Sequence, residues 1–117
     1  MFRDERQLAR VCDTLCRLCR MDGMWTDDGP TERSIALLEA KGGGLSSGER
    51  IMFLTAWSVW NGEGNASIGD VIHRLDERNL RGIGTLLLAM ATGQSADFDR
   101  WLADVDRQIG EPPRRRQ

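Results

Sequence analysis

The sequence contains no tyrosine, one histidine and one lysine among its 117 residues. Histidine is the usual titrating group near neutral pH, so a chain with His73 alone has little means for acid–base catalysis. Fifteen of the 16 basic residues are arginine, which together with 13 glycines is typical of GC-rich coding bias. No catalytic motif is recognisable either. We therefore do not expect an enzyme.

Long apolar runs and paired cysteines are also missing. No apolar run approaches the roughly 20 residues that a membrane-spanning helix needs, and the charged opening at residues 1–6 does not resemble a signal peptide. Three cysteines, an odd number, do not form a disulfide framework. These absences predict a cytoplasmic protein in a reducing compartment, with no membrane-spanning segment.

The composition that remains is that of one globular domain. Hydrophobic residues make up 40% of the chain, charged residues make up 29%, and there are four tryptophans. A disordered chain has fewer apolar residues, and a single domain of about 100–150 residues is the usual size. We expect one helical domain over residues 1–110 and a flexible basic tail over residues 111–117.

Glycines and capping residues divide the chain into five or six short helices. Cysteines and leucines recur at helical spacing and predict a first helix over about 5–22, which would end at Gly23. A loop over 23–30 and a short helix then lead to three glycines at 42–44. These glycines can act as a hinge, over 42–45, between an N-terminal helical pair and the remaining helices.

The run that follows is apolar on nearly every side. Ser46 and Glu49 form a capping box in front of it, so we expect a central, buried helix over about 47–60. The chain then forms another helix, turns near Asn79 and enters a further helix, where Gly82 and Gly84 suggest close packing of a neighbour. No segment alternates with a period of two, so the fold class is a single compact all-α bundle.

Three cysteines lie close together on the first predicted helix. Cys12, Cys16 and Cys19 fall within about 60° of arc on a helix, so they can bind a soft metal, with His73 as a fourth ligand of tetrahedral zinc. The alternative is that they fill the core, because Cys12 and Cys19 alternate with leucines in the apolar stripe. If one thiol is reactive, Cys16 is the expected one, because it lies nearest the polar border of the helix and beside Arg17 and Arg20.

A row of arginines lies on the opposite face of the same predicted helix, within about 100° of arc. Such a row can bind an acidic protein surface, although a solvated helix face is the simpler interpretation. Without the last seven residues the chain has 13 basic and 17 acidic side chains, a net charge of −4, which disfavours nucleic acid as a partner. The row consists of Arg3, Arg6, Arg10, Arg17 and Arg20.

The aromatic residues divide into a helical set and a loop residue. Phe53, Trp57 and Trp60 follow helical spacing, which predicts core packing or partial burial in a homodimer. Trp25 lies in a loop rich in glycine and aspartate, next to Met24, where less core is available. We expect these two residues to form an exposed apolar anchor for a partner.

These features predict a small, non-enzymatic protein that binds another protein and has no cofactor. Regulators, inhibitors and accessory factors encoded by phages and mobile elements, anti-CRISPR proteins among them, share this size and composition. A metal-binding protein or thiol redox sensor that uses the three cysteines is the first alternative. A DNA-binding regulator is the second.

Overall fold

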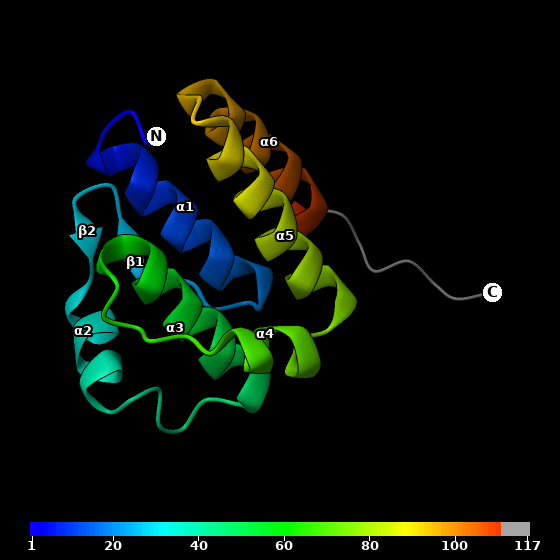
Figure 1. The fold of residues 1–117 in the computed structure, drawn as a ribbon. Coiled ribbons are helices and arrows are strands. Elements are labelled where there is room, and N and C mark those ends of the chain that lie inside the picture. Colours follow the sequence, from blue (N-terminus) through cyan, green and yellow to red (C-terminus); the bar gives the residue numbers. More distant parts are fainter. Residues whose placement is uncertain (111–117) are drawn as a thin grey trace.

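The computed structural model describes residues 1–110, which form six helices and one short hairpin (Figure 1). The predicted tail over 111–117 lies outside the described residues. The predicted all-α bundle is confirmed, and no described helix is both long enough and apolar enough to cross a membrane. The elements are α1 (Glu5–Leu18), β1 (Trp25–Thr26), β2 (Gly29–Pro30), α2 (Glu32–Glu39), α3 (Ser47–Asn61), α4 (Ile68–Arg74), α5 (Glu77–Thr92) and α6 (Ser95–Gly110).

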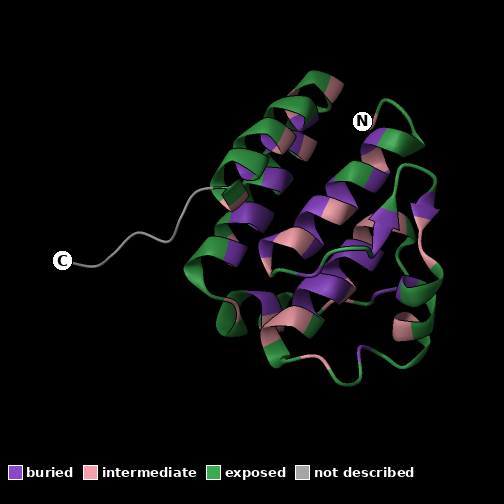
Figure 2. Ribbon diagram, turned by 180° about the vertical axis from the view of Figure 1, so that it is seen from behind, coloured by how far each residue is buried: buried purple, intermediate pink, exposed green. Residues whose placement is uncertain are grey.

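The helix predicted to be central shares that position with α1. Helix α3 buries Met52 and Phe53 completely. Helix α1 lies between α3 and the α5–α6 pair, and the hairpin also packs on it (Figure 1). In Figure 2 the buried positions follow the inner sides of these two helices, while the outer side of α6 is exposed. The core therefore forms where α1 meets its neighbours.

Helix α1 ends four residues earlier than its periodicity predicts. Arg20 has a positive φ of 65°, and its N–H donates to the Arg17 carbonyl at 3.0 Å. The N–H of Met21 donates to the Cys16 carbonyl at 3.0 Å. These two bonds form a Schellman motif, in which glycine usually takes the left-handed position. The sequence prediction was wrong here because arginine occupies that position and Gly23 comes later.

The capping box before α3 is present as predicted. The backbone N–H of Ser46 donates to Glu49 Oε1 at 2.9 Å, and the N–H of Glu49 donates to Ser46 Oγ at 3.3 Å. The backbone hydrogen bond from Ser46 lowers the pKa of Glu49. Two N–H groups of the helix start are thereby satisfied by local contacts alone.

The turn expected near Asn79 lies three residues earlier. Asp76 is the N-cap of α5, and its Oδ1 accepts a hydrogen bond from the Asn79 N–H at 2.8 Å. Asn79 is a buried residue inside the helix. The close packing predicted at Gly82 is confirmed, because a Cβ there would collide with Leu18 Cδ1, whereas the same prediction for Gly84 is wrong, because a Cβ there meets nothing within 4 Å. The N-cap residue Asp76, rather than Asn79, therefore marks the start of this helix.

The predicted hinge is a series of hydrogen-bonded turns. The N–H of Gly42 donates to the Leu37 carbonyl at 2.9 Å, and the N–H of Leu45 donates to the Gly42 carbonyl at 3.2 Å. Gly42 is buried, and a Cβ at this position would lie 2.7 Å from Arg50 Cγ. Motion at this segment stays a prediction.

Candidate protein-binding surface

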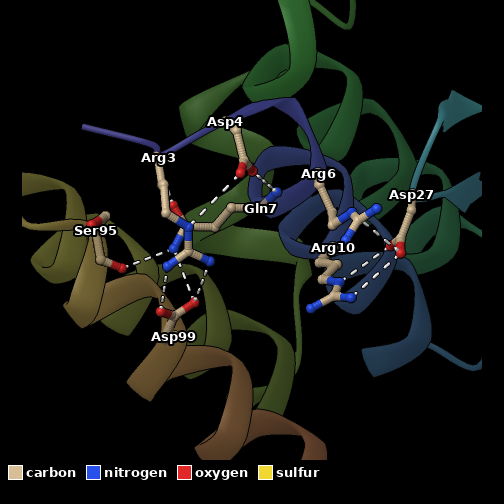
Figure 3. Close-up of polar contacts among 8 residues, drawn as sticks. All are labelled: Arg3, Asp4, Arg6, Gln7, Arg10, Asp27, Ser95 and Asp99. Atoms are coloured by element: carbon tan, nitrogen blue, oxygen red, sulfur yellow. Dashed lines mark hydrogen bonds and ion pairs between the residues drawn. The ribbon is translucent and has the colours of Figure 1, made fainter.

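The first arginine of the predicted row joins α1 to α6 (Figure 3). Arg3 Nη1 lies 2.9 Å from Asp99 Oδ2, while the buried Gln7 amide donates to Asp99 Oδ1 at 3.0 Å and to the Ser95 carbonyl at 2.8 Å. These hydrogen bonds, first from Arg3 and then from Gln7, lower the pKa of Asp99. The guanidinium is therefore part of a contact within the fold.

This contact predicts a pH-dependent stability. Because folding lowers the pKa of Asp99, its contribution is present above the unfolded value of about 3.9 and is lost as the pH falls through the folded value. We expect Asp99→Asn to be less stable than wild type at pH 7, because the charge-assisted pair with Arg3 is lost. The difference in unfolding free energy between the two proteins should shrink as the pH falls below about 3.9, because protonation of Asp99 removes the charge that asparagine also lacks. A difference that stays the same as the pH falls would contradict the role of this carboxylate.

The next two arginines hold the hairpin against α1 (Figure 3). Arg10 Nε lies 3.2 Å from Asp27 Oδ1, and Arg6 Nε lies 3.7 Å from Asp27 Oδ2. The hydrogen bond from Arg10 lowers the pKa of Asp27. Asp27 lies between β1 and β2, so one carboxylate joins the tip of the hairpin to two successive turns of the helix.

The last two arginines of the row do not share one arrangement. Arg17 Nη1 pairs with Asp106 Oδ1 of α6 at 2.9 Å. Arg20 lies beyond the end of α1, so the prediction that it belongs to the same helical face is wrong. The other four arginines all pair with carboxylates of the same chain, mostly on other elements. Binding of an acidic partner by this row stays a prediction, and it would compete with these pairs.

The prediction of an exposed Trp25 is wrong. Its side chain is only 3% exposed, and its ring centroid lies 5.2 Å from that of Trp57 and 6.5 Å from that of Phe53. Met24 is fully buried as well. The hairpin folds back over the core, because the Thr31 N–H bonds to the Met24 carbonyl at 3.0 Å while Asp27 is held by α1. Neither residue can serve as an exposed anchor.

The aromatic set of α3 belongs to the core of the single chain. Phe53 and Trp57 are buried, and Trp57 Nε1 donates to the buried Ser34 Oγ at 3.1 Å. Trp60 is half-buried and lies against Trp25. Core packing is thus confirmed for this set, and a dimer that uses Phe53 or Trp57 is excluded by their burial.

The three thiols lie in or near the core and do not form a metal site. Cys12 and Cys16 are fully buried, and Cys12 Sγ donates to the Ala56 carbonyl. Within residues 1–110 no group of three or more histidine, cysteine or acidic side chains is placed to hold a metal ion. His73 is exposed on α4, where Arg74 rather than His73 pairs with the neighbouring Asp70.

The prediction that Cys16 is the reactive thiol is also wrong. Burial raises the pKa of Cys16 well above its usual value and that of Cys12 as well. Cys19 is the half-buried thiol, and burial raises its pKa to about 11. All three therefore stay protonated at neutral pH, where a sensor thiol needs a lowered pKa.

Helix α5 carries an uncharged exposed surface. Residues 82–96 contain no ionisable side chain, although charged residues make up 29% of the chain. The comparable uncharged run at 51–62 lies mostly in the buried helix α3, whereas on α5 Leu87 is 56% exposed and Leu88 is 68% exposed. Four exposed residues with i, i+3, i+4, i+7 spacing lie on one side of this helix, and we call them the α5 ridge. The α5 ridge consists of Gly84, Leu87, Leu88 and Ala91.

The ridge lies between two hollows. A groove of about 340 Å³ separates Leu87 from α3, and all of its lining side chains are uncharged. A second hollow of about 230 Å³ lies between Leu88 and α6, and the charged residues Asp97, Arg100 and Asp104 are part of its lining. The lining of the first groove comprises Met1, Phe2, Thr55, Ser58, Val59, Ile83, Leu86, Leu87 and Met90.

A further hollow between α2 and the loop after α3 offers no comparable surface. Its volume is about 590 Å³, and its leucine floor is surrounded by Glu39, Lys41 and Glu63. All three of these charged residues are exposed, so this hollow is bordered by ionisable side chains. The α5 ridge with its groove is therefore the stronger candidate.

The sequence contained a signal for the ridge that periodicity alone missed. Leu86, Leu87 and Leu88 are consecutive, and steps of about 100° spread three neighbours over more than half of a helix. They cannot all face one core, and only Leu86 is buried. No protein family, curated protein or solved structure matches this chain. Its function is therefore inferred from its own surface.

Proposed function

We propose that this chain is a non-enzymatic protein that binds another protein through the α5 ridge and the groove beside it. The observation that supports this proposal is the exposed surface of residues 82–96, which has no ionisable side chain. Exposed apolar residues are common singly, but a continuous uncharged patch marks an interaction surface. Regulators and inhibitors that act by covering a partner's surface belong to this functional class.

Burial of the ridge supplies a favourable free energy of binding. Full burial of a leucine side chain contributes about 1.5–3 kcal/mol. Leu87 and Leu88 are each more than half exposed, so a partner can still bury most of their apolar surface. The methionines beside Leu87, Met1 and Met90, have flexible side chains that adapt to an inserted residue. The side chains that line this groove are uncharged, which suits contact with an apolar surface of a partner.

Site-specific photo-crosslinking in the native host tests this function. A photoreactive phenylalanine analogue is placed at Leu88, and in a control chain it replaces Ile72, which is 53% exposed on α4. We expect a covalent protein adduct from position 88 and none from position 72. A charge introduced into the contact, by Leu87→Glu in the same chain, should reduce the adduct at least about tenfold, which corresponds to about 1.4 kcal/mol.

Two results would contradict the proposal. One is the absence of any protein adduct at position 88. The other is an equal yield of the same adduct at both positions, which would indicate non-specific contact. Positions 72 and 88 are both exposed, so we expect the variants to fold as the wild type does. An unchanged far-UV circular dichroism spectrum checks this.

A further inference from the structure

The residues before α1 fill one end of the groove beside the α5 ridge. Met1 and Phe2 belong to its lining although they lie in no helix, and the other lining residues come from α3 and α5. The Phe2 ring is stacked on Phe98, the first aromatic residue of α6, with ring centroids 4.3 Å apart and an interplanar angle of 26°. Phe98 is fully buried, whereas Phe2 is half-buried. Phe2 therefore contacts a buried ring with one part of its surface and the groove with another.

Few contacts hold these first residues in place. In the described part of the chain the backbone of residues 1–3 makes one hydrogen bond, from the Arg3 N–H to Gln7 Oε1 at 2.7 Å. The Arg3 guanidinium pairs with Asp99, but both side chains are about half exposed, so water and salt weaken this ion pair. Met1 is 65% exposed. Local opening of this segment is therefore less costly than opening of a packed helix.

Release of residues 1–3 leaves the adjoining helices in place. Asp4 is the N-cap of α1, and its Oδ1 accepts a hydrogen bond from the Gln7 N–H at 2.8 Å without help from the preceding residues. The side-chain amide of Gln7 keeps its hydrogen bonds to Asp99 Oδ1 and to the Ser95 carbonyl, which join α1 to α6 (Figure 3). The segment can therefore move while the bundle stays folded.

We propose that residues 1–3 are a displaceable plug of the groove, and that the partner of the α5 ridge inserts an aromatic side chain in place of the Phe2 ring on Phe98. This inference rests on the proposed function, because it names the kind of side chain that the partner presents. An aromatic ring fits the vacated position, because it restores the stack on the face of Phe98 that Phe2 covers. The adjoining lining of the groove has no ionisable side chain that would pair with a charged group.

A plug of this kind makes binding selective. The partner must displace residues 1–3, so a surface whose contacts do not replace the stack between Phe2 and Phe98 binds weakly. Until the partner binds, the plug covers Phe98 and limits the apolar surface that other proteins can contact.

Binding of a small aromatic probe tests the vacated position without the partner. The probe is N-acetylphenylalaninamide, and its binding is followed by the methyl NMR signal of Met90, which lines the groove. Phe2→Ala should bind the probe at least about tenfold more tightly than wild type, in which the probe competes with the plug. N-acetylleucinamide, which is apolar but has no ring, should bind this variant less tightly. Equal binding of the two amides, or no gain in Phe2→Ala, would overturn the inference.

Two arginine variants complete the probe experiment. Arg3→Ala keeps the Phe2 ring but removes the ion pair with Asp99, so it should strengthen probe binding by a smaller factor than Phe2→Ala does. Arg107→Ala is the matched control, because Arg107 pairs with Asp104 within α6, and it should bind the probe as wild type does. Far-UV circular dichroism checks the fold of each variant. If Phe2→Ala does not fold, the comparison of Arg3→Ala with Arg107→Ala decides the result.

Photo-crosslinking from position 88 separates this inference from the proposed function. In a chain that also carries Phe2→Ala, the partner adduct should increase at least about threefold, because the plug no longer competes with the partner. An adduct in wild type that Phe2→Ala leaves unchanged or reduces overturns the plug, and the α5 ridge is still a protein-binding surface. The absence of an adduct in both chains contradicts the proposed function itself.

Discussion

Replacing Trp25 by alanine is expected to lower the free energy of unfolding by about 3–5 kcal/mol. The indole is buried against aromatic residues of α3, so its loss leaves a large cavity beneath the hairpin. Chemical denaturation followed by far-UV circular dichroism measures the effect without relying on tryptophan fluorescence. The result separates a core residue from the exposed anchor that the loop composition predicts, since an exposed residue changes stability by less than about 0.5 kcal/mol.

Two matched variants identify the cause of this loss. Trp25→Phe keeps an aromatic ring and removes Nε1, which has no hydrogen-bond partner among the described residues, so it should cost much less than alanine. Ile68→Ala removes a side chain that is 74% exposed and should leave stability nearly unchanged. If Trp25→Ala were as stable as Ile68→Ala, the packing of the hairpin on the core would be refuted.

Alanine at Gly64 is expected to destabilise the fold by about 1–3 kcal/mol through overpacking. A Cβ at this position would lie 2.8 Å from the Ser58 backbone nitrogen and even closer to the Leu54 carbonyl oxygen. Both contacts are with the backbone of α3, which cannot rotate away as a side chain can. The loop must move outward, which breaks the hydrogen bond from the Ala66 N–H to Ser58 Oγ, 3.1 Å long.

Gly48→Ala is the matched control for this substitution. Gly48 lies in the first turn of α3, and a Cβ there meets nothing within 4 Å. Alanine has the higher helix propensity, so this variant should be as stable as wild type or more stable, by up to about 1 kcal/mol. Equal unfolding midpoints for the two alanine variants would contradict the clash at Gly64, because they would show that the loop after α3 can accommodate a Cβ.

The starts of the helices could be predicted well because their signals are local. The capping box of Ser46 and Glu49 uses groups three residues apart, and its two hydrogen bonds form as soon as the helix begins. The end of α1 was harder to predict. The left-handed position at Arg20 carries no glycine, so the residue type gave no signal, and Met21, which follows it, is buried in the core.

The candidate site was the less predictable part of the molecule. Trp25 and Cys16 were assigned by the composition of their neighbours in sequence, but both are buried by segments far along the chain. The arginine row was placed correctly in part, yet Asp99, the partner of Arg3, lies 96 residues away. Helical periodicity also identifies the face of α5 that enters the core, but only the structure shows how much of Leu87 and Leu88 on the other side stays exposed.

The sequence by itself determined the all-α class, the approximate helix boundaries and the burial of Phe53 and Trp57, because capping and the 3.6-residue period act within a few neighbouring turns. Only the tertiary structure decided which loop residues are buried, how deeply each thiol is buried and which leucines are exposed. Each of these depends on how much surface the other segments cover, and that is set by packing between elements that lie far apart in the chain.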